Sequence, residues 1–299
     1  MTDTGSDTNK HKASDAENST DKKGTAKAPP LARQVIWLTG ASSGIGAALA
    51  KRLPTLCQHV FITARNQQTL NELQNGHNNV TVLAADVTDP AGLKNAADSI
   101  YQQFGRLDTL IANAGTCEYL DVQAFDGAMV QRVVQTNFFG LVNTVEAALP
   151  LLRQSQRGYI AGMSSSVTAL AMPRAEAYGA SKAATLHFLQ SLKADLSASQ
   201  IDVSAISPGF VKTPLTDVND FPMPALIPVE QAAEEIIKGL RKRRFDIHFP
   251  KRFTRILRLT GLLPDWIRFR LTAAMARSDS QPRSSHSPQH KQPSGESGQ

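Results

Sequence analysis

A tyrosine and a lysine stand four residues apart in the stretch Tyr178-Gly179-Ala180-Ser181-Lys182. Residues four apart on a helix share a face, so this spacing directs a phenol and an ammonium into one small volume. A free tyrosine has a pKa near ~10, but an adjacent cation favours the phenolate and lowers that pKa. A tyrosine tuned in this way can give a proton to a carbonyl or take one from an alcohol. Alone, the pair more often marks a solvated surface, so the neighbouring elements must decide.

A glycine-rich turn separates the first predicted strand from the first predicted helix. The apolar run at residues 34–38 is typical of a strand buried on both faces. The turn from Thr39 to Gly46 (TGASSGIG) follows it, and residues 47–53 predict a helix. Glycines let the backbone approach a ligand, and a helix N-terminus presents free N–H groups to a phosphate. The alternative is a tight turn that needs glycines for its own geometry; the strand–turn–helix order favours the phosphate site.

Arg65 ends the second predicted strand, residues 59–65. Sites for NAD place an acid near this point to hold the ribose 2′-hydroxyl, whereas an arginine accommodates a 2′-phosphate through a charge-assisted contact. No acid is present here, so the sequence favours NADP(H) over NAD(H). The alternative is that Arg65 merely opens the next helix at a solvent-exposed face.

Strands and helices alternate through the rest of the chain. Further strands are predicted at residues 80–85, 107–112, 158–163, 201–206 and 244–249, and further helices at 90–104, 125–153, 178–199 and 229–240. This alternation predicts an α/β fold, a Rossmann-type doubly wound parallel sheet of about seven strands with helices on both faces. Ligands bind such sheets at the carboxyl ends of the strands, where Asp86, Asn113 and Gly115 are expected. Asn137 stands in the middle of a predicted helix, where asparagine is unfavourable and calls for an explanation.

Together these motifs resemble the short-chain dehydrogenase/reductase family in its standard-length form, over residues Val35 to Pro214. The resemblance implies that Tyr178 is the acid/base, and that Lys182 holds the nicotinamide ribose and lowers the pKa of the tyrosine. It implies that Ser165, thirteen residues before the tyrosine, polarises the carbonyl, with Ser164 and Ser166 as neighbours. It implies that Asn137 holds a proton-relay water.

The same resemblance implies the cofactor contacts. It assigns them to Gly40, Ser42, Ser43, Gly44, Ile45, Gly46, Arg65, Asp86, Val87, Asn113, Ala114, Gly115, Tyr178, Lys182, Pro208, Gly209, Val211 and Thr213. Some family members that use NADP carry a basic residue just before the second glycine of the turn. Ser43 occupies that position here, so the NADP assignment rests on Arg65 alone.

Composition and charge limit the other classes of function. Of the 299 residues 41% are hydrophobic and 19% are charged, as in ordinary globular proteins. Residues 238–278 hold twelve Lys or Arg and two Asp, a net charge of +10. The whole chain has a net charge of +6, so the rest of the chain is near −4. A slightly acidic catalytic body predicts no nucleic-acid partner. No apolar run reaches the ~18 residues of a membrane span, and no secretory signal is present. Cys57 and Cys117 fit no metal spacing, so we expect no metal and a cytoplasmic location.

A basic amphipathic segment follows the last predicted strand. On a helical wheel Phe253, Ile256 and Leu257 lie together, and four cations lie opposite: Lys251, Arg252, Arg255 and Arg258. Less regularly placed apolar residues follow at Leu262, Leu263, Trp266, Ile267, Phe269 and Leu271. Such a helix is typical of peripheral contact with an anionic membrane surface, here the inner face of a membrane. Packing on the protein's own body or on a partner subunit explains it equally well.

The expected organisation is a disordered polar tail (residues 1–30), a catalytic domain (31–250), a basic helical extension (251–278) and a second disordered tail (279–299). An apolar segment at residues 217–228 should lie near the substrate as a lid. Its apolar content suggests a hydrophobic substrate, and contacts that anchor the loop explain it equally well. The expected function is an NADP(H)-dependent oxidoreductase acting on a ketone or secondary alcohol. A catalytically silent cofactor-binding regulator and a membrane-surface adaptor are the alternatives. The family resemblance implies a homodimer or homotetramer, built through the two long helices that carry Asn137 and Tyr178.

Overall fold

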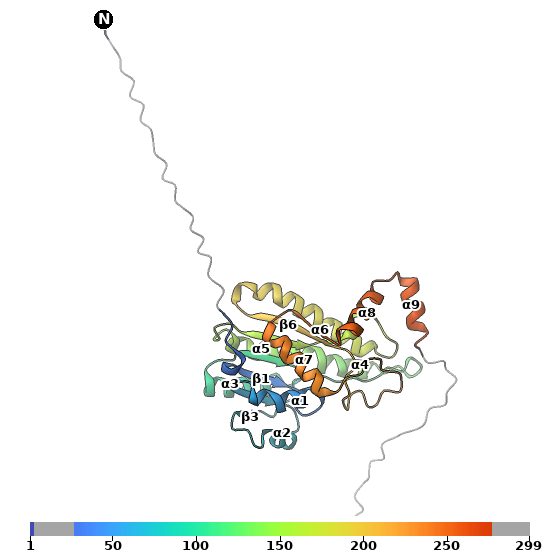
Figure 1. Cartoon of the computed structure of the whole chain (residues 1–299), viewed down its shortest axis with the longest axis horizontal. Helices are drawn as coiled ribbons and strands as arrows, with labels where there is room; N and C mark the ends of the chain where they lie inside the picture. The colour runs from blue at the N-terminus through green and yellow to red at the C-terminus, as the bar shows by residue number, and fades with distance from the viewer. Residues whose placement is uncertain (3–26, 277–299) are drawn as a thin grey trace, which may run out of the picture.

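A seven-stranded parallel sheet forms the centre of the protein, in the order β3-β2-β1-β4-β5-β6-β7, with helices on both faces (Figure 1). The computed structural model of the chain describes residues 1–2 and 27–276. The strands are β1 (Val35–Thr39), β2 (His59–Thr63), β3 (Val80–Val82), β4 (Thr109–Ala112), β5 (Tyr159–Met163), β6 (Asp202–Pro208) and β7 (Asp246–Phe249). The predicted Rossmann-type α/β fold is therefore confirmed.

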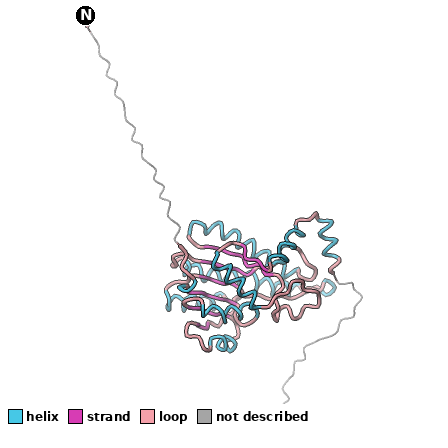
Figure 2. Tube along the Cα trace, in the orientation of Figure 1, coloured by secondary structure: helices cyan, strands magenta, loops and turns pink. Residues whose placement is uncertain are grey.

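The helices alternate with these strands in the chain, as Figure 2 shows by colour. They are α1 (Gly44–Arg52), α2 (Gln67–Gln74), α3 (Pro90–Phe104), α4 (Gly127–Val134), α5 (Gly140–Leu152), α6 (Glu176–Asp195), α7 (Val229–Lys242), α8 (Lys251–Gly261) and α9 (Asp265–Ala273). N-terminal capping side chains mark the start of several helices. Asn66, Asp89 and Asp126 each accept a backbone N–H in the first turn of the helix that they precede.

Alternate side chains of each central strand enter different cores. Ile36 and Leu38 of β1 pack under α1 and α7, while Trp37 of the same strand packs on the opposite side under α3 and α5. Successive side chains of a strand point to opposite faces, so a strand covered on both faces must be apolar at every position. All five residues of β1 are buried accordingly.

Connections run in opposite directions on the two sides of β1 and β4. The chain proceeds from β1 to β2 and β3 on one side, and from β4 to β7 on the other. Neighbouring loops diverge at this point and leave a crevice at the carboxyl edge, where ligands of such sheets bind.

The predicted long helix at residues 125–153 is wrong in detail, because three segments replace it. Helix α4 ends at Val134, a π-helical turn covers Gln135–Phe139, and α5 begins at Gly140. An extra residue in one helical turn makes such a bulge, and it rotates the side chains within it. Asn137 lies at the centre of the bulge, so its unfavourable residue type coincides with a break in the regular helix.

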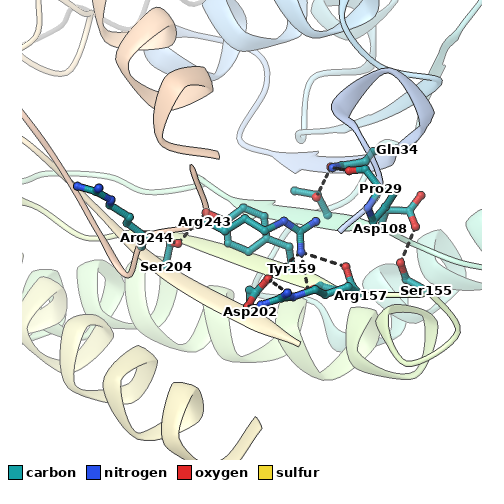
Figure 3. A network of polar contacts seen from close by, with 12 residues as sticks. Pro29, Gln34, Asp108, Ser155, Arg157, Tyr159, Asp202, Ser204, Arg243 and Arg244 are labelled. Atoms are coloured by element: carbon teal, nitrogen blue, oxygen red, sulfur yellow. Dashed lines mark hydrogen bonds and ion pairs between the residues drawn. The ribbon is translucent and has the colours of Figure 1, made fainter. Parts of the chain in front are cut away.

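A network of partly buried charges fastens the amino-terminal edge of the sheet, opposite the crevice (Figure 3). Asp202 at the start of β6 accepts hydrogen bonds from Arg157 (2.8 and 2.9 Å) and from Arg243 (2.9 Å). The Arg243 guanidinium also lies 4.7 Å from the centre of the Tyr159 ring. Burial alone would raise the pKa of Asp202, but the two arginines outweigh it and hold the pKa below its ordinary value.

The C-terminal part of the described chain packs on the body through helix α8. Thr254 and Leu257 of α8 are buried, whereas Ile256 is 62% exposed, so the predicted grouping of Ile256 with Leu257 does not hold. Helix α9 projects from the body (Figure 1). At the other end, Pro29 accepts a hydrogen bond of 2.8 Å from the Gln34 side chain. Residues 3–26 of the first predicted tail, all of the second (279–299) and the last two residues of the predicted extension lie outside the described residues.

Candidate active site

A cleft of about 680 Å³ opens at the carboxyl edge of the sheet, and every predicted site residue except Asn137 lines it. Its walls come from the turn after β1, the ends of β2 to β6 and the first turn of α6. A second hollow of about 700 Å³ is lined by residues of 68–80 and brings together none of the predicted residues. The chemistry-bearing residues therefore share one site.

The glycine turn is closely packed against the strand beside it. A β-carbon at Gly46 would lie 1.9 Å from the carbonyl oxygen of Gly40, and Gly40 itself has a φ of +68°. Asn113 donates two hydrogen bonds of 3.1 Å from its side-chain amide to the carbonyls of Thr39 and Gly40. Glycine is thus required by the turn's own geometry, and Asn113 holds the turn in shape.

Beyond this turn, the N-terminus of α1 faces the cleft with free backbone donors. Ser43 precedes the helix in an extended conformation, and its side chain accepts no N–H from the first turn. Ser42, Ser43 and Gly44 all line the cleft. An uncapped helix start next to close-packed glycines fits the diphosphate of a dinucleotide, because N–H groups and the helix dipole both favour an anion there.

Lys182 is buried, with 3% of its surface exposed, yet it reaches the cleft. Its Nζ donates a hydrogen bond of 2.9 Å to the carbonyl of Met163, at the end of β5. A β-carbon at Gly115 would lie 3.2 Å from this Nζ, so a larger residue there would crowd the ammonium. Burial lowers the pKa of Lys182 to about 8. One N–H is used by Met163, and two remain for a ligand.

Tyr178 lies half-buried one turn earlier on α6, with its ring centre 5.8 Å from Lys182 Nζ. Burial raises the pKa of Tyr178 to about 12, although a hydrogen bond with Ser165 lowers it in part. The expected lowering of this pKa by Lys182 is therefore not found in the structure. Burial disfavours both charged forms, so it raises the pKa of the phenol and lowers the pKa of the ammonium.

Two serines at the end of β5 differ in what they bind. Ser165 Oγ accepts the Val167 N–H at 3.2 Å, and its own proton is left to donate to another oxygen. Ser164 Oγ instead donates to the Lys182 carbonyl at 3.2 Å. Ser165 is the serine that interacts with Tyr178, in agreement with the thirteen-residue spacing.

Asn137 stands behind the cleft and is 1% exposed. Its side-chain oxygen accepts the Thr116 N–H at 2.7 Å, and its amide donates to the Thr116 carbonyl and to Ser181 Oγ, both at 2.9 Å. The side chain thereby joins the loop after Gly115 to helix α6. It fixes the distance between these two walls of the cleft.

The family is decided by comparison with known proteins. A model of the short chain dehydrogenase family matches residues 34–221. The chain belongs to the short-chain dehydrogenase/reductase family. An uncharacterised oxidoreductase of Myxococcus xanthus (strain DK1622) is 32% identical to it over 232 residues, which cover 76% of this chain and 92% of the relative. The 11-beta-hydroxysteroid dehydrogenase 1A of Arabidopsis thaliana is 35% identical over 212 residues, which cover 69% of this chain and 60% of that relative.

Solved structures share the fold of this short-chain dehydrogenase/reductase. One is a short chain dehydrogenase from Burkholderia cenocepacia J2315 in complex with NADP. It superposes with a TM-score of 0.71 at 24% identity, covering 84% of this chain and 100% of that one. As a member of the family, the protein is an NAD(P)-dependent oxidoreductase.

Motif reasoning missed several residues that line the cleft of this short-chain dehydrogenase/reductase. They are Ala64, Asn66, Ala85, Thr116, Glu118, Arg132, Thr136, Met163, Pro214, Leu215 and Thr216. Those next to a motif could be found by extending it by one residue. Arg132 could not, because it comes from α4 and reaches the cleft beside Glu118, with which it forms an ion pair of 3.0 Å.

The described residues contain no group of three or more His, Cys, Asp or Glu side chains that could hold a metal ion. Among the described helices, none has the length and apolar content to cross a bilayer.

Proposed function

We propose that the protein transfers hydride between NADP(H) and a ketone or secondary alcohol with an apolar body. The observation that carries this proposal is the gathering of Ser165, Tyr178 and Lys182 in one cleft that the N-terminus of α1 also lines. When bound, the nicotinamide supplies or accepts the hydride. Tyr178 gives or takes the proton at the substrate oxygen, and Ser165 donates a hydrogen bond to that oxygen.

Lys182 and Asn137 have supporting roles in this proposal. Lys182 directs its two free N–H bonds into the cleft, where a ribose hydroxyl can accept them. The amide group of Asn137 is committed to Thr116 and Ser181, so in this proposal the residue accepts a hydrogen bond from a relay water through an oxygen.

The preference for NADP(H) rests on the residues after β2. The cleft is lined there by Ala64, Arg65 and Asn66, none of which is acidic. A carboxylate at this point would accept the ribose 2′-hydroxyl and repel a 2′-phosphate, whereas a guanidinium attracts the phosphate.

An apolar substrate is supported by the segment that borders the cleft. Leu215 lines it, and Val218, Phe221 and Leu226 follow in the same loop. The Arabidopsis relative is named for a hydroxysteroid, an alcohol with a large apolar body.

A panel of carbonyl substrates tests the reaction. Short ketones, steroids and long-chain acyl carbonyls are mixed with the protein, and NADPH absorbance is followed. We expect apolar ketones to be reduced and Tyr178→Phe to lose this activity. Substrate-dependent oxidation of NADH faster than that of NADPH would contradict the cofactor preference, and equal turnover in Tyr178→Phe would contradict the proposed site.

We also propose that α8 and α9 rest on an anionic lipid surface, at the inner face of a membrane. Ile256, Leu259, Leu262, Trp266 and Phe269 are between 56% and 81% exposed, an apolar content unusual for a solvated surface. Four nearby cations are exposed and form no ion pair with a described residue: Lys251, Arg252, Arg255 and Arg270. Apolar residues beside unpaired cations complement anionic headgroups over acyl chains.

Vesicle sedimentation tests this surface. We expect the protein to bind vesicles that contain phosphatidylserine and to bind pure phosphatidylcholine weakly. Substitution of both Leu262 and Trp266 by Glu should abolish binding, while Tyr101→Glu, an exposed aromatic on α3, should not. Removal of all residues after Pro250 is a poorer test, because it also removes the buried contacts of α8.

A homodimer or homotetramer is proposed through the face that joins the π-helical turn to α6. Phe139 is 46% exposed there and lies against Phe138, which contacts Phe188 of α6 edge-on at 6.0 Å between ring centres. Light scattering should show an oligomer that Phe139→Glu weakens. A wild-type monomer at micromolar concentration would contradict the proposal.

A further inference from the structure

Residues 215–226 form a loop between β6 and α7, and its first two residues, Leu215 and Thr216, line the cleft. The base of the loop is closed by backbone hydrogen bonds from Lys212 to Ile227 (2.9 Å) and from Ile227 to Phe210 (3.1 Å). A surface loop whose ends lie close together forms a compact unit that is frequently functional. Whether it covers the cleft therefore depends on what its tip contacts.

The tip is held by two residues that lie far away in sequence. The Tyr119 hydroxyl donates to Asn219 Oδ1, and Arg174 Nη1 donates to Asp220 Oδ1 at 2.8 Å. The next residue in the loop, Phe221, meets the Tyr119 ring edge-on, with 5.8 Å between ring centres. Three successive loop residues are thus fastened to the same two side chains.

Tyr119 and Arg174 are also fastened to each other. The Arg174 guanidinium lies 5.0 Å from the centre of the Tyr119 ring, a cation–π contact. The Arg174 carbonyl accepts the Leu120 N–H at 3.0 Å, and the Arg174 backbone has a φ of +66°. A left-handed arginine is uncommon, and here its conformation accompanies both the backbone bond to Leu120 and the side-chain contact with Asp220.

This pair stands beside the reacting end of the cleft. Burial raises the pKa of Tyr119 above its ordinary range, and its nearness to Cys117 and Tyr178 raises it further. Tyr119 follows Thr116, which Asn137 holds in place, by three residues. The loop tip is therefore fastened next to the proposed acid/base rather than at a distant surface.

We propose that Tyr119 and Arg174 form a latch that holds residues 215–226 closed over the substrate beside Tyr178. The role in substrate binding rests on the function proposed above; the latch itself does not. With Phe221, Tyr119 presents aromatic surface to the part of the substrate that does not react. The Arg174 and Asp220 side chains are 34% and 40% exposed, so their ion pair is weak and the latch opens readily.

Cys117 reports on the latch without any substrate. The chain has two cysteines, and burial raises the pKa of Cys117 to about 11, which slows its reaction with a maleimide. Cys117 interacts with the side chain of Tyr119, so we expect opening of the latch to expose the thiol and to remove part of that effect. Cys57 lies in the core, where burial raises its pKa to about 12, so it reacts only when the body unfolds.

The experiment measures maleimide labelling of each cysteine by peptide mass analysis, in the full chain with NADPH added. We expect Asn219→Ala, which removes the acceptor of the Tyr119 hydroxyl, Arg174→Gln and Asp220→Asn to label Cys117 about twofold to fivefold faster than the wild type, the range of a weak exposed interaction. Asp217→Asn is the matched control, because this exposed carboxylate in the same loop forms no ion pair with a described residue. The double variant of Arg174 and Asp220 should be no faster than either single one.

Equal labelling of Cys117 in all variants overturns the latch. Equal acceleration of Cys57 and Cys117 also overturns it, since that pattern means that the whole body loosens. With a substrate from the panel, the same variants should raise KM about twofold to fivefold, by the same weak-interaction estimate, and leave NADPH affinity unchanged. A failed labelling result would leave the oxidoreductase proposal intact, because it requires no turnover.

Discussion

Lys182 Nζ donates a hydrogen bond of 2.9 Å to the carbonyl of Met163, two residues before Ser165. This bond joins helix α6 to the end of strand β5. Since Tyr178 lies one turn before Lys182, the bond also sets how far Tyr178 stands from Ser165. A lysine proposed to hold a ribose therefore also positions the two groups proposed to act on the substrate oxygen.

The buried ammonium should make stability depend on pH. Burial lowers the pKa of Lys182 from an ordinary 10.5 to about 8, so between these values the unfolded chain binds more protons than the folded one. The contribution of Lys182 to the free energy of unfolding then rises with pH across this window, by about 3 kcal/mol in total. In urea unfolding from pH 7 to 10.5, the free energy of unfolding of the wild type should rise relative to that of Lys182→Met.

The control for this prediction is Lys193→Met, an exposed lysine on the same helix. The free energy of unfolding of this variant should change with pH in the same way as that of the wild type. Parallel curves for wild type and Lys182→Met would show that Lys182 titrates normally in the folded protein.

Tyr178→Phe should remove turnover and keep cofactor binding. The ring remains, so packing on α6 is preserved, but no proton can be transferred at the substrate oxygen. General acid–base groups contribute about 10²–10⁴-fold, which is the expected loss in kcat. NADPH binding, followed by fluorescence, should change little. A variant that keeps full activity would remove Tyr178 from the mechanism.

Arg65→Ala should weaken NADPH more than NADH. A hydrogen bond to a charged group is worth about 1.5–3 kcal/mol, which corresponds to a roughly tenfold to hundredfold loss for the phosphorylated cofactor. NADH has no 2′-phosphate and should bind nearly as before. Titrations of both cofactors measure this, and equal losses for the two would show that Arg65 only shapes the loop after β2.

Asp202→Asn should destabilise the fold without affecting the site. The Asp202 carboxylate forms ion pairs with Arg157 and Arg243. Arg243 Nη2 has no hydrogen-bond partner among the described residues, so loss of the carboxylate would leave the charge of Arg243 with little compensation. We expect a loss of about 2–3 kcal/mol at pH 7, while Asp98→Asn, which breaks an exposed pair with Lys94, should cost below about 1 kcal/mol.

The same carboxylate makes an acid-dependent contribution. Because its folded pKa is held below the unfolded value, its stabilisation is complete above the unfolded pKa and is lost as pH falls through the folded pKa. The difference between wild type and Asp202→Asn should therefore shrink below about pH 4. A constant difference down to pH 2 would show that the arginines do not lower this pKa.

From its sequence alone, the protein could be assigned a doubly wound parallel sheet of about seven strands and a site at its carboxyl edge. The reason is that strand–helix alternation and motifs such as Tyr178 and Lys182 are local, and parallel strands must end at one edge. The spacing also selected Ser165, because that serine and the tyrosine lie on consecutive elements.

The tertiary structure decided what depends on contact between distant segments. It showed that α8 separates Leu257 from Ile256, that Asn137 lies in a π-helical turn, and that burial outweighs Lys182 in setting the pKa of Tyr178. It also brought Tyr119 within reach of Asn219, one hundred residues away. No local pattern encodes such a contact, since loop packing follows from the positions of all the elements that carry the loops.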